Sequence, residues 1–222
     1  EAMREVLGRD IKKVPALRGK VILTIFLEAS TRTRVSFEQA GKILSADVIN
    51  ISGAGSSAEK GESLLNTALT LQAMHADLII IRSPQSGAPY FLAHNLQSVS
   101  VINAGDGTHA HPTQALLDLM TMRRHLGDLA GAKVVIVGDI LHSRVARSDI
   151  YGLATLGANV VLSGPPTMMP LGILQGRFEH LPISITVQPE LDKAVEDADV
   201  IMALRIQKER ASSGLLPSMR EY

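Results

Sequence analysis

The sequence alternates, in two successive series, between short runs of aliphatic and β-branched residues and longer amphipathic stretches. Short apolar runs bounded by turn residues predict buried strands, and apolar residues three and four apart predict helices. The expected strands are Val21–Leu27, Asp47–Ile51, Asp77–Arg82, Val99–Asn103, Lys133–Val137, Val160–Ser163, Ile183–Val187 and Val200–Leu204, and the main helices are Thr31–Ser45, Glu62–His75, Tyr90–Leu96, Pro112–Leu126 and Ser143–Leu156. Buried strands that alternate with helices are typical of parallel sheets. We therefore predict an α/β fold with two doubly wound parallel-sheet domains.

The segment from Gly127 to Gly131 separates the two series and marks the predicted domain boundary. We assign residues 1–128 to the first domain and 129–222 to the second. The second series ends in a loop with no closing element, so we expect the second domain to be incomplete, its C-terminal part missing.

Composition excludes several classes of protein. Lys plus Arg and Asp plus Glu are both 22, which gives a net charge of zero and argues against a nucleic-acid partner. Cysteine is absent, which excludes disulfides, thiolate zinc sites and cysteine nucleophiles. The apolar runs, such as Leu78–Ile81, are too short to span a bilayer. We expect a cytoplasmic protein with no membrane partner.

The segment Ser30-Thr31-Arg32-Thr33-Arg34 follows a predicted strand and opens a helix. A helix N-terminus offers free N–H groups and a positive dipole end, and arginine binds phosphate with two hydrogen bonds. The simpler alternative is a helix cap with arginines in solvent. The cluster of hydroxyls and guanidinium groups favours a phosphate site.

The segment His109-Ala110-His111-Pro112-Thr113-Gln114 has three interpretations. Two histidines can bind zinc, although no second cluster of ligands is evident. The same residues can cap the helix that begins at Pro112. His111 and Gln114, three residues apart, can also form hydrogen bonds with a carbonyl or amide group. The spacing does not decide among these three.

Arg144 and Arg205 each lie just after a strand of the second series. The turn from Gly138 to Arg144 lacks the Gly-x-Gly-x-x-Gly pattern of dinucleotide-binding proteins, so we do not expect NAD. Either arginine could hold a carboxylate, with Gln207 beside Arg205, or lie in solvent.

These candidates share one position in the fold. In open α/β sheets, ligands bind at the carboxyl ends of the strands. The residues placed there are Ser30 to Arg34, Arg82, His111, Arg144 and Arg205. This placement predicts anionic substrates, one with a phosphate and one with carboxylates.

The same residues resemble the signatures of the aspartate and ornithine carbamoyltransferase family. The resemblance begins at Ser30–Arg34 and continues in the same order over nearly the whole chain, through Lys60-Gly61-Glu62, Arg82-Ser83-Pro84-Gln85, Asn103-Ala104-Gly105-Asp106-Gly107, His111-Pro112-Thr113-Gln114, Val137-Gly138-Asp139 with Ser143-Arg144, and Arg205–Arg210. The Lys60 segment, Arg144 and the Arg205 segment resemble the aspartate-specific branch. The Ser-Met-Gly stretch of the ornithine branch is not found, since Ser218-Met219 is followed by Arg220.

The resemblance implies transfer of the carbamoyl group of carbamoyl phosphate to the amino group of L-aspartate. The products would be N-carbamoyl-L-aspartate and phosphate, in de novo pyrimidine biosynthesis. No cofactor and no metal are implied. A homotrimer with shared active sites is implied, with a regulatory or dihydroorotase-like partner chain as an open possibility.

The resemblance also assigns roles to individual residues. Carbamoyl phosphate would be bound by Ser30, Thr31, Arg32, Thr33, Arg82, His111 and Gln114, and aspartate by Lys60, Arg144, Arg205 and Gln207. Thr33, Arg82, His111 and Lys60 would be catalytic, the first three acting on the carbonyl oxygen. Ser56 and Lys60 would belong to a loop that reaches the neighbouring subunit's site.

Three alternatives stay open at this point. They are an ornithine-type or other carbamoyltransferase, a non-catalytic phosphate-binding or assembly subunit, and a metal hydrolase that uses His109 and His111. The family's later His-Pro-x-Pro motif does not occur before Tyr222, and the chain begins at Glu1. We therefore expect a chain truncated at both ends, or a degenerate copy.

Overall fold

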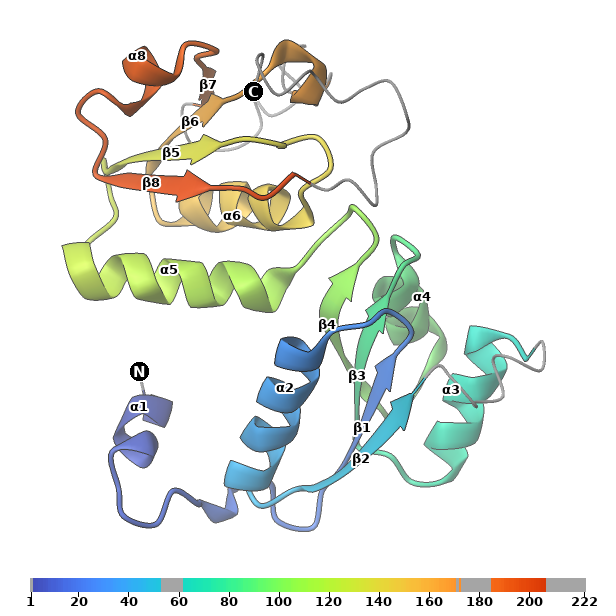
Figure 1. The fold of residues 1–222 in the computed structure, drawn as a ribbon. Coiled ribbons are helices and arrows are strands. Elements are labelled where there is room, and N and C mark those ends of the chain that lie inside the picture. The colour runs from blue at the N-terminus through green and yellow to red at the C-terminus, as the bar shows by residue number, and fades with distance from the viewer. Residues whose placement is uncertain (1, 53–61, 171, 173–184, 207–222) are drawn as a thin grey trace. The chain divides into compact units, whose positions relative to one another are not determined.

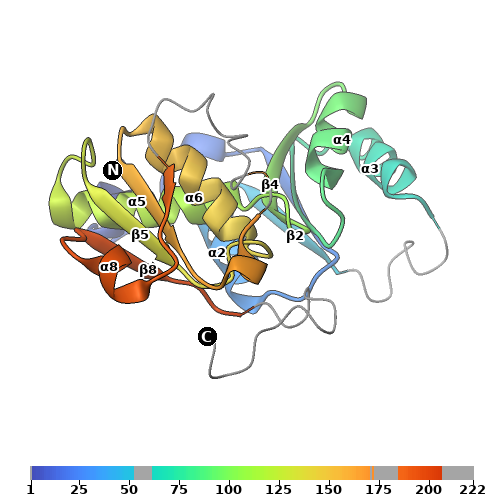
Figure 2. The same cartoon turned by 90° about the horizontal axis from the view of Figure 1, so that it is seen from above.

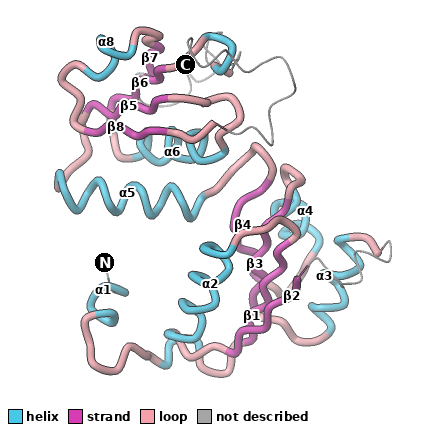
Figure 3. Tube along the Cα trace, viewed as in Figure 1, coloured by secondary structure: helices cyan, strands magenta, loops and turns pink. Residues whose placement is uncertain are grey.

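The computed structural model describes residues 2–52, 62–170, 172 and 185–206. The chain divides into two compact units, residues 1–107 and 108–222. Each unit contains a four-stranded sheet in which all described strand pairs are parallel (Figure 3). The predicted α/β class with two parallel sheets is confirmed. The domain boundary after residue 128 stays a prediction.

The sheet of unit 1 has the strand order β2-β1-β3-β4. Its strands are β1 (Val21–Phe26), β2 (Asp47–Ser52), β3 (Leu78–Ser83) and β4 (Ser100–Asp106). After β1 the chain adds β2 on one side and then returns to add β3 on the other side. This reversal makes the gap between β1 and β3 a topological switch point, where open α/β sheets bind ligands.

Helices cover both faces of this sheet (Figure 1, Figure 2). They are α2 (Thr31–Ile43) on one face and α3 (Leu64–Ala73) with α4 (Ala88–Asn95) on the other, and the unit also contains α1 (Ala2–Leu7) and a 3₁₀ helix (Pro15–Leu17). Alternate residues of β1 enter two different cores. Leu23 and Ile25 pack with residues of α3 and α4, whereas Ile22 and Phe26 pack with Phe37 of α2.

The sheet of unit 2 has the strand order β7-β6-β5-β8. Its strands are β5 (Lys133–Val137), β6 (Asn159–Ser163), β7 (Ile185–Val187) and β8 (Val200–Ala203). The chain builds outward from β5 and then returns to place β8 on the other side. The switch point of this sheet therefore lies between β5 and β8.

The helices of unit 2 are α5 (Pro112–Leu126), α6 (Arg144–Thr155) and α8 (Leu191–Val195), with a 3₁₀ helix at Pro166–Met168. Both α5 and α6 contribute to the main core, where Leu119 and Leu153 pack with Val134 and Ile136 of β5. On the opposite face, Ala194 of α8 packs against Val135 and Val161. Among the described residues, no helix has the combination of length and apolar character needed to cross a membrane.

The predicted element ends differ from the structure where single residues set the backbone. The helix predicted to reach Ser45 ends at Ile43, and Ser45 has a φ of 66°, which a helix cannot contain. The helix predicted to begin at Tyr90 begins at Ala88, because Gly87 precedes it with a φ of 85° and Pro89 suits the first turn. Residues 183 and 184 of the strand predicted from Ile183 lie outside the described part of the chain.

Candidate functional site

The predicted phosphate-binding segment lies at the switch point of unit 1. Ser30 is the N-cap residue of α2 and has extended backbone, but its hydroxyl makes no capping bond within the described part of the chain. Thr31 and Arg32 are exposed, and Thr33 is half-buried, in a first turn without acidic residues. The hydroxyl of Ser30 and the first N–H groups of α2 can therefore serve an anion. The simple capping alternative for Ser30 is not what the structure shows.

Arg82 lies at the end of β3, across the same switch point. Its side chain is 12% exposed, and its Nη2 lies 3.6 Å from Oε1 of Glu28, the residue two positions after β1. Its Nη1 donates to the carbonyl oxygen of Ala104 at 3.4 Å. The backbone N–H of Leu27 also donates to the carbonyl of Arg82 at 2.9 Å. These contacts hold a largely buried guanidinium beside the segment that leads to Ser30.

A buried carboxylate joins the loop that follows β3 to the end of β4. Asp106 has no exposed surface. Its Oδ2 accepts from the N–H of Gly87 at 2.6 Å, and its Oδ1 accepts from Nδ2 of Asn103 at 2.7 Å. Gly107 has a φ of +47°, and a Cβ there would lie 2.8 Å from the backbone nitrogen of Ser86. The loop after β3, through Ser86 and Gly87, and the segment Asn103–Gly107 thus support one another.

The His111 segment begins α5 in unit 2. His111 is the N-cap residue, is 8% exposed, and its backbone N–H donates to Oγ of Ser148 on α6 at 2.8 Å. Gln114, in the first turn, donates from Nε2 to Oδ1 of Asp118 at 3.0 Å. The first turn of α5 is therefore held by two polar contacts, and sequence analysis did not identify either partner residue.

Two carboxyl groups near this turn, those of Asp118 on α5 and Asp149 on α6, interact electrostatically. Asp149 of α6 has no exposed surface, and neither of its oxygens has a hydrogen-bond partner among the described residues. Burial first, and the charge of Asp118 second, raise the pKa of Asp149 to about 8. Burial also raises the pKa of Asp118, although the hydrogen bond from Gln114 lowers it. At a pKa of about 8, the carboxyl of Asp149 would be mostly protonated at neutral pH.

Arg144 and Arg205 follow the two strands that flank the switch point of unit 2. Arg144 is the first residue of α6 and is only 3% exposed, so the alternative of a solvated side chain is wrong for it. Ser143 caps α6 by accepting from the N–H of Ala146 at 3.1 Å. Arg205 lies just beyond β8 and is exposed, and the backbone N–H of Leu204 donates to the carbonyl of Val137 at 2.8 Å.

Two further observations concern histidines: the contacts of His142 in the turn after β5, and the absence of a metal-ligand group around His109 and His111 in the described part of the chain. His142 donates its backbone N–H to Oδ1 of the buried Asp139, and its Nδ1 lies 2.8 Å from the same oxygen. The described residues contain no group of three or more His, Cys, Asp or Glu side chains placed to hold a metal ion. The hydrolase alternative based on His109 and His111 thus gains no ligand set from them.

Three predicted site residues, Ser56, Lys60 and Gln207, lie outside the described residues. Their roles stay predictions.

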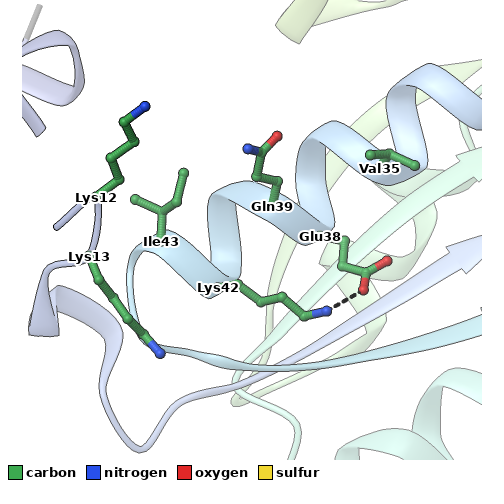
Figure 4. Close-up of a pocket in the computed structure, with 7 residues that line it drawn as sticks. All are labelled: Lys12, Lys13, Val35, Glu38, Gln39, Lys42 and Ile43. Atoms are coloured by element: carbon green, nitrogen blue, oxygen red, sulfur yellow. Dashed lines mark hydrogen bonds and ion pairs between the residues drawn. The ribbon is translucent and has the colours of Figure 1, made fainter. Parts of the chain in front are cut away.

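A separate hollow lies along α2 in unit 1, and none of the predicted site residues lines it (Figure 4). It is lined by Lys12, Lys13, Val35, Glu38, Gln39, Lys42 and Ile43. Lys42 pairs with Glu38 at 2.5 Å, and both lysyl and apolar groups are open to solvent. This exposed surface lacks the buried, oriented donors found at the two switch points.

The fold and the site together define the class. Guanidinium and hydroxyl groups follow the strands at the switch points of two open parallel sheets, as in α/β enzymes that bind anionic substrates. The family model "Aspartate/ornithine carbamoyltransferase, carbamoyl-P binding domain" matches residues 1–124. The model "Aspartate/ornithine carbamoyltransferase, Asp/Orn binding domain" matches residues 130–221. The chain belongs to the aspartate/ornithine carbamoyltransferase family, and it is an enzyme of the carbamoyltransferase class.

Similar proteins of known sequence point to one branch of the family. The chain is 59% identical over 222 residues to the aspartate carbamoyltransferase catalytic subunit of Roseiflexus castenholzii, covering all of this chain and 68% of that protein. It is 57% identical over 223 aligned positions to the catalytic subunit of Chloroflexus aurantiacus, covering 71% of it.

Solved structures agree with the fold. The aspartate transcarbamoylase of Trypanosoma cruzi in complex with carbamoyl aspartate and phosphate has a TM-score of 0.84 at 31% identity, over 95% of this chain and 69% of that one. The catalytic subunit of the M. jannaschii enzyme has a TM-score of 0.80 at 38% identity, over 94% and 68%.

Proposed function

We propose that this enzyme transfers the carbamoyl group of carbamoyl phosphate to the amino group of L-aspartate. The products are N-carbamoyl-L-aspartate and phosphate, and the reaction belongs to de novo pyrimidine biosynthesis. One observation carries this proposal most directly: each sheet has its predicted anion-binding residues at its own switch point. Those residues are Ser30–Thr33 and Arg82 at β1/β3, and Arg144 and Arg205 at β5/β8. Relatives at 55–59% identity carry the same activity in their names.

Phosphate binding falls to unit 1 in this proposal. The first turn of α2 supplies N–H groups, the hydroxyls of Ser30, Thr31 and Thr33, and the exposed guanidinium of Arg32. Arg82 adds a second guanidinium that is already oriented by Glu28. Bidentate arginine contacts suit the phosphate group, and oriented donors reduce the entropy lost on binding.

The chemical step requires stabilisation of a growing negative charge. The amine of aspartate attacks the planar carbonyl carbon, electrons move to the carbonyl oxygen, and the carbon–oxygen bond to phosphate then breaks. Thr33, Arg82 and His111 are the proposed donors to that oxygen. Loss of one such donor typically lowers turnover by about 100- to 1000-fold. The departing phosphate takes up a proton that the amine loses.

Aspartate binding falls to Arg144, Arg205, Gln207 and Lys60. Arg144 is buried at the start of α6 and is therefore held in a fixed direction, whereas Arg205 is exposed beyond β8. Two guanidinium groups suit the two carboxylates of aspartate. A basic amino acid such as ornithine would place a cation among these cations, which disfavours it.

The proposed assembly is a homotrimer in which Ser56 and Lys60 complete the site of a neighbouring subunit. A cyclic trimer has head-to-tail interfaces, so one chain can donate a loop to the next. Location in the cytoplasm, and any regulatory or dihydroorotase-like partner chain, stay predictions from sequence.

The direct test is an acceptor assay on the full-length protein. With carbamoyl phosphate present, we expect N-carbamoyl-L-aspartate from L-aspartate and no citrulline from L-ornithine. Citrulline as the main product would favour the ornithine-type alternative. Binding of N-(phosphonacetyl)-L-aspartate without turnover of either acceptor would favour the non-catalytic alternative.

A further inference from the structure

Gln114 makes a contact that limits how its amide can be turned. Its Nε2 donates to Oδ1 of Asp118, one helical turn further along α5, at 3.0 Å. The other oxygen of Asp118, Oδ2, is buried and has no hydrogen-bond partner among the described residues. A carboxylate only accepts hydrogen bonds, so it attracts the NH₂ side of an amide and repels the oxygen side.

We infer that Asp118 is a positioning residue that fixes the amide of Gln114 with its oxygen toward the carbamoyl group, and so selects carbamoyl phosphate over acyl phosphates of the same shape. The inference rests on the proposed role of Gln114 and extends it. The amide oxygen and nitrogen of glutamine point in different directions from the amide carbon. With Nε2 held by Asp118, Oε1 is turned away from Asp118 and accepts from the NH₂ group of the carbamoyl substrate.

Hydrogen bonding favours the charged form on Asp118 rather than on Asp149. Asp149 is fully buried, and no group among the described residues donates a hydrogen bond to it, whereas Asp118 receives one from Gln114. The two carboxyls interact electrostatically, and burial raises the pKa of Asp149 to about 8. Burial raises the pKa of Asp118 as well, but the hydrogen bond from Gln114 lowers it and so favours the charged form on the member that contacts Gln114.

Ser148, which precedes Asp149 on α6, holds the first turn of α5 through a separate contact. Ser148 accepts from the backbone N–H of His111 at 2.8 Å, three residues before Gln114. The backbone at the start of α5 and the side chain of Gln114 are thus held by separate contacts. Loss of the Asp118 contact should free the amide to rotate while the turn stays in place.

The consequence is a difference between two ligands of nearly equal size. Acetyl phosphate has a methyl group where carbamoyl phosphate has an NH₂ group. Binding of acetyl phosphate would place a methyl group against Oε1 and leave that oxygen without a partner, which weakens binding by about ten- to a hundredfold. An amide free to rotate could turn its oxygen aside and would discriminate less.

The experiment measures dissociation constants for carbamoyl phosphate, acetyl phosphate and inorganic phosphate on the full-length protein. The variants are Asp118→Asn, Asp118→Glu and Gln114→Ala. The control is Asp197→Asn, which removes the same charge at an exposed position whose left-handed backbone asparagine tolerates. Circular dichroism confirms that each variant is folded.

We expect the preference for carbamoyl over acetyl phosphate to fall about tenfold in Asp118→Asn. It should be largely retained in Asp118→Glu, which keeps the carboxylate, and unchanged in Asp197→Asn. Affinity for inorganic phosphate should stay the same in all of them. Equal weakening of all three ligands in Asp118→Asn would show a merely structural role and overturn the inference.

The outcome for Gln114→Ala separates this inference from the proposed function. If Gln114→Ala loses the preference and Asp118→Asn keeps it, the role of Gln114 stands and the inference about Asp118 is wrong. If Gln114→Ala keeps the preference, Gln114 does not bind the carbamoyl amide, and both the assigned role and the inference fail.

Discussion

Replacement of Asp149 by asparagine should change how the stability of this protein depends on pH. Asp149 has no exposed surface and neither carboxyl oxygen has a hydrogen-bond partner in the described part of the chain. Burial, followed by the charge of Asp118, raises its pKa from an ordinary 3.8 to about 8. The buried side chain is thus protonated in the folded protein over a pH range in which the unfolded chain has released that proton.

The sign of the effect follows from proton linkage. Below pH 3.8 both states hold the proton, and this group costs nothing. As pH rises from 3.8 to 8 the folded state holds a proton that the unfolded state lacks, so the free energy of unfolding falls. The slope is at most about 1.4 kcal/mol per pH unit. Between pH 5 and pH 8 the loss would reach about 4 kcal/mol, a large part of the stability of a domain.

Asparagine has nearly the shape of a protonated aspartic acid and does not ionise. Urea unfolding at intervals from pH 5 to pH 8 should therefore show that Asp149→Asn loses less stability than the unchanged protein as pH rises. Asp197→Asn, at an exposed position, should follow the unchanged protein. If Asp149→Asn and the unchanged protein gave parallel curves, the side chain of Asp149 would not be held protonated, and the reasoning from its burial would be refuted.

Three further predictions concern the proposed site in the full-length protein. Arg32→Ala should weaken binding of both carbamoyl phosphate and inorganic phosphate, because a bidentate donor is lost, and unchanged phosphate competition would rule out the assigned role. Arg205→Ala should raise the KM for aspartate about ten- to a hundredfold, since a hydrogen bond to a charged group contributes about 1.5–3 kcal/mol, and an equal rise for carbamoyl phosphate would contradict a dedicated carboxylate contact. The variants Lys60→Ala and Arg82→Ala should each be nearly inactive as homotrimers. If each site takes Lys60 from one chain and Arg82 from the next, trimers reassembled from an equal mixture of the two variants should regain about a quarter of full activity. No recovery in confirmed mixed trimers would exclude sharing of Lys60 between subunits.

The sequence pattern predicts the fold because a central strand such as β1 is apolar on both faces. Ile22 and Leu23 are adjacent in β1 and enter different cores, which is why that segment shows no alternation of polar and apolar residues. The order of the strands in the sheet is harder to predict from sequence. That β3 pairs with β1, on the side away from β2, depends on helices that cross opposite faces of the sheet, and no local pattern encodes it.

The candidate site is only partly readable from sequence. The Ser30 segment is recognisable because donors are concentrated at one helix start, and the described backbone agrees. The acidic residues Glu28, Asp118 and Asp149 are harder to find, since acidic side chains are not expected beside residues proposed to bind anions. The contact of Asp118 with Gln114 could have been predicted from one feature of the sequence. The two residues are four apart in a predicted helix, and this spacing brings their side chains together. No feature of the sequence predicts the burial of Asp149, because aspartate is rarely fully buried.

The two arginines proposed to hold aspartate differ in a way that follows from their positions. Arg144 begins a helix that packs against the sheet, so its side chain is buried before any substrate binds. Arg205 follows a strand end and is exposed, so a substrate can reach its side chain from solvent. A buried guanidinium defines where one carboxylate must lie, and an exposed one can be reached by the second carboxylate from solvent. A site with one fixed and one exposed arginine thus combines orientation with access, and it does so because the switch point brings a helix start and a strand end together.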